Sequence, residues 1–190
     1  MLRLATLVLV VTVAACGQMR GARALPALPR GATAQVAEDN YLVDGNTIDQ
    51  IRASLGASRG YHRWNLRYRY SCRPSGGICE MTDVTIDLES TIVVPRWTGR
   101  ATASVAVITL WDRYITVLRS HEYTHREYSY RAARDISRTL LDLTTRDCAG
   151  MQQLANSNGQ RILDRYRRLN SEFDEESRGT ITWPPRPGSR

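Results

Sequence analysis

Lysine is absent from the sequence, so all 26 of its basic residues are arginine. Against 19 acidic residues they give a formal net charge of +7, a sign that would suit a nucleic-acid-binding protein. The arginines are mixed with acidic residues, however, as in RAARDISRTLLDLTTRD from Arg131, and such mixing is typical of a solvated helix face. We therefore predict no nucleic-acid partner.

Glycine and proline are missing from residues 100–149, which excludes a turn built on either residue in this long stretch. Residues recur there in steps of three and four, the spacing of one face of an α-helix. The set consists of Trp111, Ile115, Leu118, Glu122, His125, Ser129, Ala132, Ile136, Leu140 and Leu143. We predict one long helix whose buried face includes the polar residues Glu122 and His125.

Shorter segments complete a single domain. Thr-Ile-Asp-Gln from Thr47 is typical of the capping box of a short helix, which we expect to end at Gly56. Apolar and polar residues alternate in residues 64–72 and 81–95, which predicts two strands joined through a Pro-Ser-Gly-Gly turn. A second amphipathic segment covers residues 151–172. Because strands precede helices, we predict an α+β fold in which a small antiparallel sheet packs against the long helix and a second, C-terminal helix.

The first residues have the features of an export signal. Arg3 precedes an apolar run over residues 4–13 that is too short to span a membrane in the mature protein. The following Ala-Ala-Cys resembles a bacterial lipobox, so we predict a signal peptide over residues 1–15 and a lipidated Cys16. Gly17 does not resemble an inner-membrane retention signal, which favours the outer membrane, facing the periplasm. The alternative is an ordinary signal peptide with a chance cysteine.

The two ends of the chain differ in composition from its middle. Residues 16–40 are rich in glycine, proline and alanine without a periodic apolar pattern, which predicts a lipidated N-terminus and flexible tether. Residues 180–190 predict a proline-rich, loosely packed tail. The folded domain is therefore expected to cover residues 41–179.

Cysteine occurs four times, and lipidation of Cys16 leaves three cysteines in an oxidising compartment. We expect one disulfide and one free thiol. Cys72 and Cys79 flank a short turn and could staple a hairpin, whereas a bridge from Cys79 to Cys148 would join the strands to the helical half. Spacing alone leaves both pairings open. The lack of a C-x-x-C pair argues against a structural zinc knuckle.

Histidine occurs only three times, and two of the three lie in the sequence HEYTH from His121. Histidines four residues apart on a helix are one turn apart, so both imidazoles can bind a single zinc ion. The glutamate after the first histidine projects to where it can take a proton from a metal-activated water. We predict His121 and His125 as zinc ligands and Glu122 as a general base.

The alternative for this motif is that both histidines make only local hydrogen bonds. Against this, the motif interrupts a buried apolar stripe, where unsatisfied polar side chains would destabilise the fold. A metal ion would satisfy all of them together.

Four segments of the chain are similar to one known family. They are VVPRW from Val93, WDRYITVLRSHEYTHREYSYRAARDI from Trp111, DCAGMQQLAN from Asp147 and ILDRYRRLNSEFDEES from Ile162. These segments resemble the DUF922 family of bacterial secreted zinc-dependent proteases over most of residues 41–179. The resemblance implies a zincin-like domain that hydrolyses a protein or peptide substrate. It also implies zinc on His121 and His125, Glu122 as the base, and a Cys79–Cys148 bridge.

The chain departs from the family pattern at the third zinc ligand. That pattern ends in Tyr-Asp-x-x-Thr-x-His-Gly, whose histidine is the natural third ligand, whereas this chain reads FDEESRG from Phe173. Asp174 or Glu176 could supply an oxygen instead, and His62 is the only other imidazole. We expect a lipid-anchored zinc metallopeptidase of the cell envelope. The alternative is a non-catalytic envelope lipoprotein with a degenerate site that acts as a binding or scaffolding module.

Overall fold

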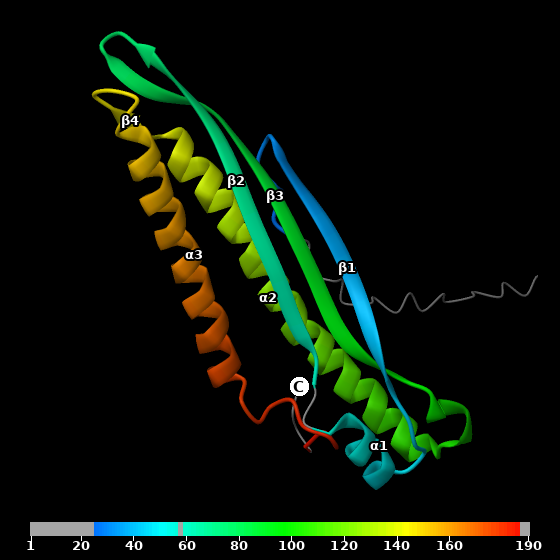
Figure 1. Ribbon diagram of the computed structural model, residues 1–190. Helices are drawn as coiled ribbons and strands as arrows, with labels where there is room; N and C mark the ends of the chain where they lie inside the picture. Colours follow the sequence, from blue (N-terminus) through cyan, green and yellow to red (C-terminus); the bar gives the residue numbers. More distant parts are fainter. Residues whose placement is uncertain (1–24, 57–58, 187–190) are drawn as a thin grey trace, which may run out of the picture.

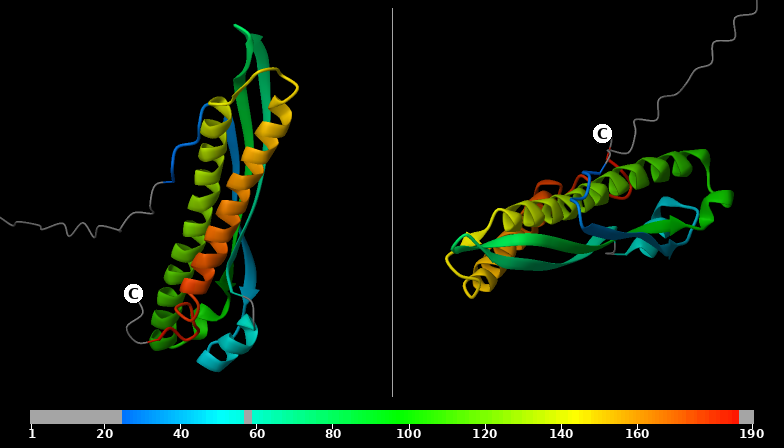
Figure 2. Two further views of the ribbon diagram at one scale, coloured as in Figure 1. Left: turned by 90° about the vertical axis from the view of Figure 1, so that its left-hand side faces the viewer. Right: turned by 90° about the horizontal axis from the view of Figure 1, so that it is seen from above.

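The computed structural model describes residues 25–56 and 59–186 and consists of a sheet with two long helices on one face (Figure 1). In chain order the elements are β1 (Ala32–Val43), α1 (Ile48–Leu55), β2 (Tyr61–Ser75), β3 (Ile78–Trp97), the short 3-10 helix η1 (Gly99–Thr102), α2 (Val105–Leu141), β4 (Thr144–Thr145) and α3 (Met151–Glu176). Helix α2 runs along the sheet and α3 lies beside it, so the molecule is elongated (Figure 2). The predicted α+β fold is confirmed.

The sheet is mixed, and β3 is its central strand. Strands β2 and β3 pair antiparallel through a two-residue turn in which Gly76 and Gly77 have φ angles of 56° and 87°. Two successive positive φ angles suit a hairpin turn that favours glycine at both positions. Strand β1 pairs in parallel with the other edge of β3, so the sheet is not purely antiparallel as predicted. The chain reverses twice between β1 and β3, at α1 and at the hairpin, which makes these strands run the same way.

Strand β1 begins at Ala32, inside the range 16–40 that was predicted to be a tether. Most of its side chains are exposed, so it lacks the alternating pattern by which a strand is recognised. Backbone pairing with β3 holds it in place, together with the buried side chain of Arg126 on α2. The guanidinium Nη2 of Arg126 donates to the carbonyl oxygen of Ala37 over 2.7 Å. The prediction of a tether was therefore wrong for residues 32–40.

Helices α1 and α3 begin where the sequence indicated, whereas the sequence marked no start for α2. Thr47 caps α1 by accepting a hydrogen bond from the backbone N–H of Gln50, whose side chain accepts one from Asn46, and Gly56 follows the last turn. Ser104 caps α2 in the same way. Helix α2 has 37 residues, so it is roughly 55 Å long.

Two apolar clusters lie between the helices and the sheet. One joins β2 and β3 to α3 and the C-terminal half of α2, and includes Ile86, Leu88, Tyr130, Ile136, Leu140 and Ile162. The other lies around α1 and the first turns of α2, and includes Val43, Ile51, Trp97, Trp111, Tyr114 and Leu118. Between Leu118 and Tyr130, α2 buries the polar side chains of Glu122, His125 and Arg126. The predicted motif thus lies where the two clusters meet.

A disulfide joins Cys79 of β3 to Cys148, three residues before α3 begins. This is the pairing that the family resemblance implied, and it is confirmed. Cys72 of β2 is free and half-buried, and its sulfur lies within 4.8 Å of both sulfurs of the bridge. The hairpin pairing of Cys72 with Cys79 was therefore a reasonable alternative that the fold does not adopt.

Part of the predicted C-terminal tail is packed. Ile181 is buried, and the indole N–H of Trp183 donates to the carbonyl oxygen of Ile48 over 2.9 Å. The ring of Trp183 also meets the rings of Trp111 and Tyr114 edge-on. The prediction of a loose tail from residue 180 was therefore wrong for these residues, because two apolar side chains complete the cluster around α1.

Two predictions at the N-terminus, the signal peptide over residues 1–15 and the lipidated Cys16, lie outside the described residues. Within residues 25–56 and 59–186, no helix combines the length and the apolar character that crossing a bilayer requires.

Candidate metal centre

The side chains of the HExxH motif lie on the buried face of α2. Glu122 is 2% exposed and His125 is 5% exposed, while His121 is half-buried. Both histidines contact side chains of α3, which lies beside α2 (Figure 2). The stretch without glycine or proline therefore contains one long helix, as predicted, and the motif lies on the buried face of this helix.

Asp174 of α3 brings a carboxylate to both histidines. Its Oδ1 atom lies 3.0 Å from Nε2 of His121 and 2.9 Å from Nε2 of His125, and the two Nε2 atoms are 3.0 Å apart. Ligand atoms about 2.0–2.1 Å from one tetrahedral zinc ion lie roughly 3.3 Å from each other. Two imidazoles and a carboxylate are also a donor set that zinc accepts. The residues present therefore fit a zinc ion.

Asp174 is thus the candidate third ligand that the structure places with the histidines. The other carboxylate considered, Glu176, is exposed and does not belong to this group. Asp174 and Glu176 are two residues apart on α3, so they project from different sides of the helix. The sequence could not choose between them, because the choice depends on the rotation of α3 against α2.

His62 of β2 lies near the centre without joining it. Its Nε2 atom is 2.9 Å from Oγ of Ser90 on β3, and its ring is stacked on that of His125 with 6.5 Å between centroids. Burial, and to a lesser extent His125 and Arg126, lower the pKa of His62 to about 3. His62 is therefore a neutral imidazole at ordinary pH, satisfied by a hydroxyl.

Asn170 of α3 orients the imidazole of His125. The amide Nδ2 of Asn170 donates to the carbonyl oxygen of Tyr166 over 2.6 Å, which turns Oδ1 towards the imidazole. That oxygen lies 2.6 Å from Nδ1 of His125, so Nδ1 carries the proton and donates it. The lone pair of Nε2 is then left free to face Asp174 and His121, which is the tautomer that a metal ligand needs.

The ring of His121 is held by Phe173, the only phenylalanine of the chain. The two rings are stacked with centroids 4.7 Å apart, and Phe173 also meets the ring of His125 edge-on. Burial and the neighbouring His125 lower the pKa of His121, while Asp174 opposes them. The neutral form that binds metals is therefore favoured at His121.

Glu122 is placed as an isolated carboxyl group beside the histidines. Its Oε2 atom is buried and has no hydrogen-bond partner within residues 25–56 and 59–186. Burial, with a smaller contribution from the charge of Asp174, raises the pKa of Glu122 to about 8. Such a group takes up and releases protons near neutral pH, and a cation on the adjacent histidines would favour its ionised form.

Gly60, just before β2, leaves room for this carboxyl group. A Cβ atom at Gly60 would lie 3.0 Å from Oε1 of Glu122 and 2.9 Å from Cδ1 of Leu118. Both distances are shorter than ordinary van der Waals contact, so a larger residue would have to displace the base.

Sequence reasoning missed Asn170, Phe173 and Gly60. One signal was present, since Tyr166, Asn170 and Asp174 are spaced by four and therefore share one face of α3. That face could not be assigned to the histidines without knowing that α3 packs against α2.

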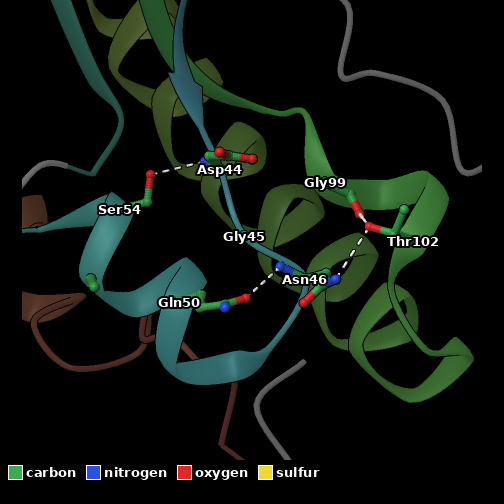
Figure 3. A pocket seen from close by; sticks show the side chains of 8 residues that line it. Asp44, Gly45, Asn46, Gln50, Ser54, Gly99 and Thr102 are labelled. Atoms are coloured by element: carbon green, nitrogen blue, oxygen red, sulfur yellow. Dashed lines mark hydrogen bonds between the residues drawn. The ribbon is translucent and has the colours of Figure 1, made fainter.

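Away from the histidines, a hollow of about 450 Å³ lies around the loop after β1 and is lined by residues of α1 and η1 (Figure 3). Its polar groups bond to one another: Ser54 accepts from the backbone N–H of Asp44, and Asn46 bonds to Gln50 and Thr102. Asp44 is the one titratable side chain among the residues that line it. This hollow has no set of groups comparable to the histidine centre.

A family model for DUF922, described as a bacterial protein of unknown function, matches residues 38–180. The match covers well over half of the chain and includes both histidines, both bridged cysteines and Asp174. The chain belongs to the DUF922 family. Membership of DUF922 confirms the resemblance seen in the sequence, and the family description assigns no activity. Comparisons with curated proteins and with solved structures gave no match.

Proposed function

We propose that this DUF922 protein is a zinc-dependent peptidase. The observation that carries the proposal is the position of Asp174, whose Oδ1 lies within 3.0 Å of Nε2 of both His121 and His125. These donors come from two helices and from residues far apart in the chain, and they meet beside an isolated carboxyl group on Glu122. A surface pair of histidines that made only local hydrogen bonds would need none of these features.

Each residue has a distinct role in the proposed reaction. His121, His125 and Asp174 would hold zinc, which when bound supplies a Lewis acid that polarises a peptide carbonyl and activates water. Glu122 accepts the proton of the attacking water at its carboxylate and gives a proton to the leaving amine. Burial raises the pKa of Glu122 to about 8 without a metal, and a zinc ion on the adjacent histidines would bring this pKa down towards neutral pH, where the carboxyl group can both accept and donate a proton.

The proposal includes export and a lipid anchor on Cys16. It is supported by the apolar run that ends in Ala-Ala-Cys at the N-terminus and by a disulfide, which suits an oxidising compartment. The substrates would then be proteins or peptides of the cell envelope.

One observation favours a competing function, a non-catalytic envelope lipoprotein that binds or scaffolds a partner. The two histidines and Asp174 are close enough to satisfy one another by hydrogen bonds without a metal. A protein that keeps this arrangement as a structural element would need no zinc at all.

Metal content and hydrolysis separate the two functions. We expect the purified protein to keep about one zinc ion after dialysis and to hydrolyse fluorescently labelled casein. Glu122→Gln should keep the zinc and lose hydrolysis by about a hundredfold or more, because an amide cannot accept the proton. Glu172→Gln, an exposed change on α3, is the matched control and should alter neither quantity.

Two results would count against the proposal. A zinc content far below one per chain would favour the scaffolding function. Unchanged hydrolysis in Glu122→Gln would assign the activity to a contaminant.

A further inference from the structure

A pocket of about 170 Å³ opens directly beside the candidate zinc ligands. Its walls include His121 and Glu122 of α2, Gly60 before β2, and Ser177 just after α3. Two arginines complete it: Arg59, from the segment that precedes β2, and Arg178, from the turn that follows α3. Groups that would act on a peptide bond and two strong cations therefore share one small pocket.

Both arginines are available to a ligand. Arg59 and Arg178 are exposed, and within the described part of the chain neither guanidinium forms an ion pair or donates a side-chain hydrogen bond. Most other arginines of the sheet and helices pair with a carboxylate, as Arg63 does with Asp39. Asp174, a carboxylate that lines the same pocket, is turned towards the histidines.

We propose that Arg59 and Arg178 bind a carboxylate of the peptide substrate next to the bond that is cleaved. This inference rests on the proposed peptidase function and names its substrate class. A guanidinium presents parallel N–H groups that match the two oxygens of a carboxylate, and such pairs are among the strongest hydrogen bonds in proteins. The carboxylate belongs either to the C-terminus of the substrate or to an acidic side chain.

The size of the pocket limits how far this carboxylate lies from the reacting bond. A pocket of about 170 Å³ that also contains Glu122 holds little more than one residue of a peptide. Leu118 and Ile181 give it an apolar wall, which suits the side chain of that residue. The recognised carboxylate is therefore on the residue adjacent to the cleaved bond.

Arg59 also lines a second hollow, of about 200 Å³, together with Tyr114 and Trp183. Arg59 is therefore common to both hollows. The aromatic walls of the second hollow offer a place for an apolar group of the substrate.

Binding to metal-free protein tests the inference without any catalysis and without zinc as a carboxylate ligand. The probes are acetyl-Ala-Ala-Ala with a free C-terminus, the same peptide as its amide, and acetyl-Ala-Asp-Ala amide. We expect at least one carboxylate-bearing peptide to bind about tenfold or more tightly than acetyl-Ala-Ala-Ala amide in an NMR titration. If the free acid binds more tightly, the recognised carboxylate is the C-terminus of the peptide. If the aspartate peptide binds more tightly, the recognised carboxylate is an acidic side chain.

Variants assign the preference to the two arginines. Arg178→Gln and Arg59→Gln should each remove most of the preference for the tighter-binding carboxylate peptide over acetyl-Ala-Ala-Ala amide. Arg178→Lys should restore part of this preference, since a lysine keeps the charge but not the paired N–H groups. Arg168→Gln, at an exposed arginine on α3, is the matched control and should leave the preference unchanged. All four changes are at exposed positions, so the variants should remain folded.

The outcomes separate this inference from the proposed function. Equal binding of all three peptides, or an equal loss of the preference in Arg168→Gln, would overturn the carboxylate site. Zinc-loaded protein that cleaves both carboxylate-bearing peptides no better than acetyl-Ala-Ala-Ala amide would overturn the carboxylate site alone. Protein that binds the acid through Arg178 but cleaves nothing would overturn the peptidase function and leave the carboxylate site standing.

Discussion

The imidazole Nδ1 of His125 lies 2.6 Å from the amide Oδ1 of Asn170, which is four residues before Asp174 on α3. One face of α3 therefore supplies both a candidate ligand and the group that fixes the tautomer of another. The centre depends on the contact between α2 and α3 as much as on the HExxH motif.

Replacing Asn170 with alanine should weaken zinc binding about 10- to 100-fold, because His125 loses the acceptor that fixes its tautomer. Asn170→Asp keeps an acceptor oxygen and should retain most of the affinity. Competition with a chelator measures both. Asn158→Ala, which removes a buried asparagine of α3 far from the motif, should lower thermal stability and leave zinc affinity unchanged. Equal zinc affinity in wild type and Asn170→Ala would show that Asn170 does not orient the ligand.

The third ligand can be identified by comparing two neighbouring carboxylates. Asp174→Ala should bring the zinc content after dialysis far below one per chain, since two histidines alone hold zinc poorly. Glu176→Ala should keep the wild-type content, because Glu176 is exposed and apart from the histidines. Metal analysis of both variants, with circular dichroism to show that they are folded, decides between them. Loss of zinc from Glu176→Ala alone would reverse the assignment.

The contribution of His62 to the stability of the metal-free protein should fall as the pH falls below 6.5, and below 4.5, the ordinary pKa of a glutamate, Glu122 with its raised pKa no longer opposes this loss. Burial, with His125 and Arg126 on α2, lowers the pKa of His62 from 6.5 to about 3 in the folded chain. The unfolded chain therefore binds more protons between these values, and the free energy of unfolding falls by up to about 1.4 kcal/mol per pH unit from His62. Urea unfolding at a series of pH values measures the slope. His62→Gln should flatten it, and identical slopes in both proteins would contradict the prediction.

Gly99→Ala should destabilise the protein by about 1–3 kcal/mol. A Cβ at Gly99 would lie 2.0 Å from the backbone oxygen of Gly45, which also accepts the indole N–H of Trp97, so the loop of Figure 3 would have to move. Gly150→Ala is the control, because its added Cβ meets nothing within 4 Å and its φ is −75°. Urea unfolding of both variants tests the pair, and similar losses would show that the contact with Gly45 is unimportant.

Cys16→Ser should move the protein from the membrane to the soluble envelope fraction, because the thiol that accepts the lipid is removed. Immunoblots of fractionated cells measure the distribution, with Cys72→Ser as a control that leaves the anchor in place. A wild-type protein found in the soluble fraction would exclude lipidation.

Local patterns were enough to predict the helices and the hairpin. The cap at Thr47, the spacing along α2 and the alternation in β2 and β3 all report contacts between residues that are near in sequence or lie on one face of an element. Strand β1 was missed because its stability comes from pairing with β3 and from Arg126, and neither leaves a pattern in the strand itself.

Only part of the candidate site could likewise be predicted from the sequence. His121, Glu122 and His125 lie within one helical turn of each other, so their spacing alone places them together. Asp174 and Asn170 reach them from another helix, and the choice of Asp174 over Glu176 required the orientation of α3. Arg59 and Arg178 gave no signal at all, since an arginine in an arginine-rich chain is not distinctive.

The bridge between Cys79 and Cys148 fastens the beginning of α3 to the sheet, while Asp174 lies near the other end of this helix, about 35 Å away. A zinc ion shared with α2 would then be a second cross-link at the opposite end. A helix that is cross-linked only at its first residues can move or fray at its last turns. A helix that is cross-linked at both ends keeps a fixed position between the sheet and α2. Loading zinc should therefore protect the final turns of α3 from hydrogen exchange far more than the first turns, which the disulfide already holds.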